Sequence, residues 1–264
     1  MSIKRNEGIV LRSLKLGETS KILHLYTRES GLLKLVAKGA RKSPSKLGGS
    51  VEPLYTIEAV YYEKENRELQ VLSQASILEA PRNVFKEADR LLLGMACCEM
   101  VSRLETTGSG NPKVYGLLRA SIRALDEVTL EPRHIFFAFQ LRFLQLLGVS
   151  PGIDRCCACG SKRTEAMGYV YSEAKLYCPD CFQGAVALKP MEANLLVALR
   201  QLERLPLSAV GKLGLPANIL LGLYDFLTAF YRYHLEELGT LKSIEVLKQM
   251  KRLEAESAPG NKTG

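Results

Sequence analysis

Four cysteines in two tight pairs constrain this chain more than any other feature. The pairs are Cys156 with Cys159 and Cys178 with Cys181, and 18 residues separate them. Each C-x-x-C turn can aim two sulfurs at one ion, and two such turns complete a tetrahedral four-thiolate zinc site. Four sulfurs leave no coordination position for water or substrate. We therefore expect one structural Zn²⁺ and no metal catalysis.

Other uses of these thiols have to be weighed. Cys157 could replace Cys156 or be spare, although the usual two-residue gap favours Cys156 with Cys159. Two disulfides or a redox dithiol could also employ four cysteines. Residues 1–7, however, place charges where the apolar core of a secretory signal would begin, so we expect no such signal and reduced thiols in the cytoplasm. Redox dithiols rarely come as two matched pairs, so zinc remains the favoured interpretation.

The positive charge of the chain is concentrated near its N-terminus. Residues 1–50 contain 11 Lys and Arg but only three Asp and Glu, and the remainder contains 25 of each. The whole formal net charge of +8 therefore belongs to the first fifth of the chain. This asymmetry predicts a polyanionic partner at that end, and the alternative is a basic face that serves only solubility.

The first 80 residues are predicted to form a five-stranded barrel. Short runs rich in β-formers lie at 8–16, 20–27, 32–38, 53–62 and 68–78, with turn residues between them. Tyr55, Ile57, Ala59 and Tyr61 alternate along the fourth run and should share one face. Five short strands in this length suit an OB-fold. Residues 38–49 contain four basic residues, three glycines and a proline, which indicates a flexible basic loop between strands three and four.

Helical periodicity begins after Pro81 and continues to about residue 253. Helices are predicted at 83–105, 111–127, 133–147, 190–204, 216–238 and 243–253. The third is apolar almost all round, which is typical of a central buried helix. Cys97 and Cys98 lie in an apolar stretch and are predicted core residues. The fold class is thus α+β, with an OB domain at 1–80, a helical domain at 81–253, a zinc finger inserted at about 150–186, and a disordered tail at 254–264.

Catalytic motifs are missing from the sequence. Its three histidines lie in no recognisable catalytic spacing, and no phosphate-cradling glycine loop or nucleophile turn occurs. The longest apolar run, residues 213–224, is too short to cross a bilayer. These absences together favour a binding protein over an enzyme and exclude a membrane-spanning helix.

A basic barrel could bind DNA, because single strands need cations for the phosphates and flat rings for the bases. The candidate DNA-binding residues are Lys15, Lys21, Lys34, Lys38, Arg41, Lys42 and Lys46. Lys34 and Lys38 share strand parity and should lie on one face. Tyr26, Tyr55, Tyr61 and Tyr62 could supply rings, or they could simply fill the barrel.

Several segments resemble the RecO family of bacterial recombination mediators. They are residues 7–11 (Glu-Gly-Ile-Val-Leu), 17–22 (Gly-Glu-Thr-Ser-Lys-Ile), 27–31 (Thr-Arg-Glu-Ser-Gly), 37–42 (Ala-Lys-Gly-Ala-Arg-Lys) and 147–154 (Leu-Gly-Val-Ser-Pro-Gly-Ile-Asp). The last segment runs directly into the first cysteine pair. The resemblance covers residues 5–250, and the cysteines place the chain in the zinc-bearing branch.

The resemblance implies a fold and a function. It implies an OB domain on a helical domain that carries a zinc finger. It further implies a non-enzymatic, nucleoid-associated protein that binds single- and double-stranded DNA and anneals complementary strands. The implied partners are RecR, the acidic tail of the single-strand DNA-binding protein, and, indirectly, RecA, which it would help load. A groove holding Arg or Lys in the helical domain is the expected type of tail site.

A zinc-ribbon factor that binds RNA or a polymerase is the alternative interpretation. Its basic contacts would cluster beside the first cysteine pair, where Arg155, Lys162 and Arg163 lie. A zinc enzyme is a second alternative, but it would require an open coordination position.

Overall fold

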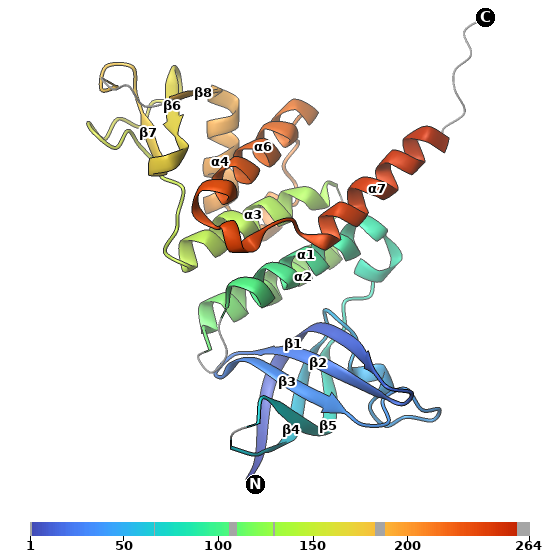
Figure 1. Cartoon of the computed structure of the whole chain (residues 1–264). Coiled ribbons are helices and arrows are strands. Elements are labelled where there is room, and N and C mark those ends of the chain that lie inside the picture. Colours follow the sequence, from blue (N-terminus) through green and yellow to red (C-terminus); the bar gives the residue numbers. More distant parts are fainter. Residues whose placement is uncertain (1, 66, 106–109, 129, 183–187, 258–264) are drawn as a thin grey trace, which may run out of the picture.

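The N-terminal part is a closed five-stranded barrel, as predicted. The computed structural model describes residues 2–65, 67–105, 110–128, 130–182 and 188–257. The barrel strands are β1 (Ser2–Leu16), β2 (Ser20–Thr27), β3 (Gly31–Ala37), β4 (Thr56–Glu63) and β5 (Leu69–Glu79). They close in the order β1-β2-β3-β5-β4, with only the β3–β5 pair parallel. Figure 1 shows this barrel beneath the helical part of the chain.

Four barrel strands differ from their predicted bounds. β4 begins at Thr56 rather than residue 53, and β3 and β5 are each shifted by one residue. β1 begins at Ser2 rather than residue 8, because Ser2–Ile9 pairs with β4. Its first residues are exposed and charged, so they gave no alternating pattern. β3 ends at Ala37, where Ala40 N donates to the Ala37 carbonyl and begins a turn. Lys38 therefore lies beyond the strand, and the parity argument that placed it on the face of Lys34 was wrong.

The helical part follows the predicted order. Its elements are α1 (Ala88–Leu104), α2 (Pro112–Glu127), α3 (Pro132–Leu146), α4 (Ala193–Arg204), α5 (Leu207–Val210), α6 (Ala217–His234) and α7 (Lys242–Ser257). Asn111 caps α2, because its side-chain oxygen accepts from the backbone N–H groups of Lys113 and Val114 at 3.1 and 3.3 Å. Ten of the 15 residues of α3 are buried, which confirms it as the central helix.

Some helix boundaries were predicted incorrectly. Residues 189–191 form strand β8 (Lys189–Met191), because they pair with β6 (Met167–Val170), so α4 starts later than predicted. The short helix α5 was not predicted. Helix α6 ends at His234, and a 3₁₀ turn (Glu236–Leu238) follows. α7 continues to Ser257, so the first part of the predicted tail is helical, while residues 258–264 lie outside the described residues. Within the described chain, no helix has the length and apolarity to cross a membrane.

One hydrophobic core joins the barrel to the helices. Ile9, Leu11, Tyr26 and Leu54 of the barrel belong to the same buried cluster as α1, α2, α3 and α6. Val10, between the first two, faces the separate interior of the barrel. The two parts are therefore packed on each other through an apolar interface rather than linked by a tether.

A polar network borders this interface. The Tyr115 hydroxyl of α2 donates to Glu7 Oε1 of β1 at 2.6 Å, and Arg119 Nη1 donates to the same oxygen at 2.9 Å. Arg119 and Arg123 also bind Glu79 at the end of β5, with Nε–oxygen distances of 2.9 and 2.8 Å. The hydrogen bond from Arg119, with support from Arg123, lowers the pKa of Glu79 from 4.5 to about 2, against the effect of burial.

This lowered pKa predicts how stability depends on pH. The ionised Glu79 side chain contributes to the free energy of unfolding. That contribution is complete above its unfolded pKa of 4.5 and is lost as pH falls towards its folded pKa of about 2. Glu79→Gln should therefore destabilise the protein at about pH 6 and much less at about pH 3. Urea unfolding of both proteins at the two pH values checks this. An equal loss at both values would contradict it.

Candidate metal centre and nucleic-acid interface

The two cysteine pairs flank a β-hairpin. The first pair precedes β6 and the second follows β7 (Lys175–Tyr177), and these strands are antiparallel, with Gly168 opposite Tyr177. The hairpin returns the chain so that the second pair comes to lie against the first. β8 adds a third strand on the other edge of β6. We call residues 150–182 together with β8 the cysteine module.

The four predicted sulfurs come together in the structure. The Sγ atoms of Cys156, Cys159, Cys178 and Cys181 all lie within 4.8 Å of one another. The Cys159 and Cys178 sulfurs are 3.7 Å apart, and the backbone N–H of Cys178 points at Cys156 Sγ at 3.4 Å. Four thiolates at this separation fit a single tetrahedral metal ion, and N–H donors to sulfur are the usual outer contacts of such a site.

Cys157 is not part of this cluster. Its side chain is exposed, while Cys156 is only 1% exposed. The Cys157 backbone N–H instead donates to the Leu176 carbonyl at 2.9 Å, and its thiol contacts the Tyr177 hydroxyl. Burial opposes ionisation of Cys156, but N–H groups of Cys159, Cys178 and Ala158 lower its pKa to about 6. The geometry therefore selects Cys156 over Cys157 as the candidate ligand.

The remaining two cysteines are core residues, as predicted. Cys97 and Cys98 of α1 are fully buried, and burial raises the pKa of both thiols. They lie in the shared hydrophobic core and not in the four-sulfur cluster.

The cysteine module is fixed to the helices. Arg200 of α4 donates from Nε to the Ile153 carbonyl at 2.9 Å and from Nη1 to the Lys162 carbonyl at 3.1 Å. The fully buried ring of Tyr169 packs edge-on against Phe226 of α6, with centroids 5.0 Å apart. The cluster thus lies in a segment whose backbone is held by the helical domain, which suits a structural role.

The cations beside the cysteines have acidic neighbours. Arg163 Nη2 lies 2.6 Å from Asp180, and Arg155 Nε lies 3.0 Å from Asp154. Lys162 is exposed and makes no ion pair with the described residues. Asp154 also pairs with Arg204 of α4, so the ion pairs engage these arginines without balancing every positive charge.

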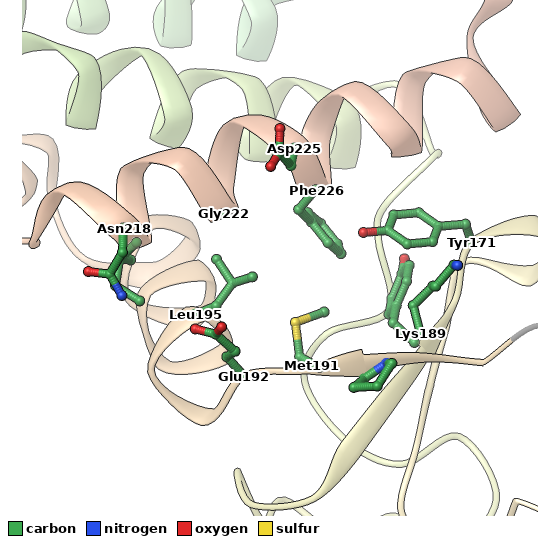
Figure 2. A pocket seen from close by; sticks show the side chains of 12 residues that line it. Tyr171, Lys189, Met191, Glu192, Leu195, Asn218, Gly222, Asp225 and Phe226 are labelled. Atoms are coloured by element: carbon green, nitrogen blue, oxygen red, sulfur yellow. The ribbon is translucent and has the colours of Figure 1, made fainter.

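A cavity lies between the cysteine module and helices α4 and α6. It has a volume of about 220 Å³, and Figure 2 shows Tyr171, Met191 and Phe226 on its walls. Lys189, Glu192 and Asp225 also line it. This is the kind of groove in which we expected an acidic tail to bind, but its two carboxylates outnumber its lysine. The charge of this cavity does not match an acidic ligand.

The predicted DNA-binding residues gather mainly at one end of the barrel. Lys15 lies opposite Lys21 in the β1–β2 register, and Lys21 lies opposite Ala37, the last residue of β3. The end of β1, the start of β2 and the loop after β3 are therefore neighbours. The cationic end, as we name it, comprises Lys15, Lys21, Lys38, Arg41, Lys42 and Lys46. Lys34 lies further along β3, opposite His24.

Hydrogen bonds hold the basic loop against the β1–β2 turn. Arg41 donates from its backbone N–H to the Thr19 carbonyl at 2.9 Å and from Nη1 to the Gly17 carbonyl at 2.8 Å. Ala40 and Leu47 of the loop are buried in the barrel core. The loop predicted to be flexible is thus anchored at several points.

The seven predicted cations differ in availability. Lys21 Nζ lies 2.8 Å from Glu52, and Lys34 pairs with Glu68. Lys15, Lys38, Lys42 and Lys46 are exposed and make no ion pair within the part of the chain that the structure describes. The ion-paired lysines could not be told from the others in the sequence, because an ion pair such as Lys21 with Glu52 joins residues 31 positions apart.

Fold and site together define a barrel-containing binding protein with a four-cysteine module. Residues 1–81 match the family model "Recombination protein O N terminal", and residues 86–244 match "Recombination protein O C terminal". The chain therefore belongs to the RecO family of DNA repair proteins, which are DNA-binding, non-enzymatic recombination mediators. The resemblance seen in the sequence is confirmed.

Individual relatives agree with this family. The DNA repair protein RecO of Chlorobium luteolum is 30% identical over 263 residues, which cover 94% of this chain and 98% of the relative. That of Rubrobacter xylanophilus is 32% identical over 212 residues, covering 79% and 84%. That of Thermoanaerobacter sp. is 27% identical over 236 residues, covering 89% and 94%.

Proposed function

We propose that this protein binds DNA through the cationic end, anneals complementary strands and helps load RecA on single-stranded DNA during recombinational repair. Its proposed partners are single- and double-stranded DNA, RecR and the single-strand DNA-binding protein, in the bacterial cytoplasm at the nucleoid. The observation that carries the proposal is a set of four exposed lysines at one end of the barrel that make no ion pair with any residue the structure describes. Family membership supports it.

Annealing requires no bond chemistry. Two complementary strands repel each other through their phosphates, and a protein promotes pairing when its cations replace the counterions that would otherwise screen that repulsion. Lys15, Lys38, Lys42 and Lys46 have the exposure for this task. Lys21 and Lys34 would first have to leave Glu52 and Glu68.

The four-cysteine cluster is proposed to hold one Zn²⁺ with a structural role. The ion would fasten the two ends of the β6–β7 hairpin, and no step of the activity would pass through it. We further propose that residues 1–80 and 81–253 are the functional units, with the cysteine module as an insertion at about 150–186 in the second.

The alternative of an RNA- or polymerase-binding zinc ribbon has less support. It would use Arg155, Lys162 and Arg163. Both arginines are ion-paired with aspartates, and only Lys162 makes no ion pair with the described residues. Four such lysines lie at the cationic end instead.

Strand annealing by the full-length protein tests this proposal. Lys42→Ala with Lys46→Ala should weaken DNA binding about 25-fold at about 0.1 M salt, since each lost phosphate contact is worth about fivefold there. Annealing of complementary oligonucleotides at subsaturating protein should slow accordingly. The matched control is Lys113→Ala with Lys212→Ala, which removes two exposed lysines from the helical domain. Equal annealing by the two double variants would overturn the proposal.

A further inference from the structure

The two segments that carry the cationic end contain no aromatic ring. These segments, residues 14–22 and 37–50, include no Phe, Tyr or Trp, and the whole chain has no Trp. Its exposed apolar side chains include Leu14 and Leu16, each 39% exposed, which offer no planar surface. Sites that hold the bases of single strands usually stack them on aromatic rings. This end of the barrel lacks that means of holding a base.

The tyrosines of the barrel are engaged elsewhere. Tyr26 is fully buried, and its hydroxyl donates to Glu105 of the helical domain at 2.8 Å. Tyr61 is 2% exposed, and Tyr55 packs edge-on against Phe85. Tyr62 pairs with Ile3 of β1 and with Val71 of β5, and Val71 pairs with Val36, so Tyr62 lies two strands away from the end of β3. The other three rings therefore serve packing, and none of the four belongs to the segments that carry the cationic end.

The free cations also lack the planar fork of arginine. All four are lysines, whose compact ammonium groups act as point charges and do not fix the orientation of a base. The one arginine of the cationic end, Arg41, donates to the Gly17 carbonyl. These lysines therefore offer charge for the phosphates but no ring on which a base could stack.

We infer that the cationic end holds DNA by its phosphodiester backbone alone and leaves the bases exposed. This inference rests on the proposed function and adds the recognised chemistry to it. A strand held in this way keeps its base edges free for a complementary strand, which annealing requires. The surface should accept any base sequence, and single or double strands alike.

Binding of abasic DNA tests the inference. The full-length protein is titrated with a mixed-sequence oligonucleotide and with one of equal length in which every nucleotide is a tetrahydrofuran abasic site. We expect dissociation constants within about twofold and equal salt slopes. One stacked base would weaken abasic binding at least about fivefold. A loss of that size or larger would overturn the inference.

A base-reactivity measurement gives a second readout. Thymines in bound single strands should stay as reactive to permanganate as in free strands, and protection would contradict backbone-only binding. A quadruple variant distinguishes failure of the proposed DNA-binding surface from failure of the backbone-only inference. It carries Lys15→Ala, Lys38→Ala, Lys42→Ala and Lys46→Ala. If it binds ordinary DNA like the unmodified protein, the proposed surface is wrong. If it loses binding but abasic DNA also binds poorly, only the backbone-only inference is wrong.

Discussion

Cys178→Ser is expected to abolish binding of the Zn²⁺ that we propose for the four-cysteine cluster and to lower the free energy of unfolding by several kcal/mol. Cys178 is 1% exposed, and its backbone N–H and sulfur both face other cysteines of the cluster. Structural Zn²⁺ contributes on the order of 10 kcal/mol to small zinc domains, and that contribution is coupled to folding. Loss of one of four ligands should loosen the cysteine module first, because its hairpin has only short strands of its own.

Cys157→Ser provides the matched control for this prediction. It changes the same chemical group at an exposed position outside the cluster, so metal content and stability should stay close to those of the unmodified protein. Zinc per chain by elemental mass spectrometry and the thermal unfolding midpoint are the measurements. A Cys178→Ser protein that retains one zinc and an unchanged midpoint would contradict the account.

The quadruple lysine variant of the cationic end is expected to bind DNA several hundred-fold more weakly at about 0.1 M salt. Each phosphate contact on a single strand contributes about 0.7 to the salt slope, which corresponds to about fivefold in affinity at that concentration. The four side chains are exposed and have no packing role, so stability should change little.

The control for this quadruple variant replaces four exposed lysines outside the barrel. Alanine at Lys86, Lys113, Lys189 and Lys212 lowers the net charge by the same amount but leaves the barrel unchanged. Fluorescence anisotropy with a labelled single strand compares the two variants. Similar losses in both would mean that net charge, and not the cationic end, determines the affinity.

Features fixed by local chemistry could be predicted from the sequence. The C-x-x-C spacing determines which sulfurs can face one ion, and Cys156, Cys159, Cys178 and Cys181 do cluster. Asn111 followed by proline predicted the start of α2 correctly. The closed barrel followed from strand runs separated by clear turn residues.

Features fixed by tertiary pairing could not be predicted. β8 forms because Met191 pairs with Met167, which lies 24 residues earlier and across the hairpin. The anchoring of Arg41 on Gly17 and the ion pair of Lys21 with Glu52 likewise join separate segments. These contacts divide the predicted cations into free and engaged groups, a division that composition alone cannot supply.

The salt dependence of single-strand binding shows whether lysines at the end of the barrel hold DNA through its phosphates. The logarithm of the association constant is plotted against the logarithm of salt concentration for the unmodified protein and the quadruple variant Lys15→Ala, Lys38→Ala, Lys42→Ala and Lys46→Ala. The slope should be shallower by about 3 in the variant, because each lost phosphate contact removes about 0.7. An unchanged slope and affinity would contradict it.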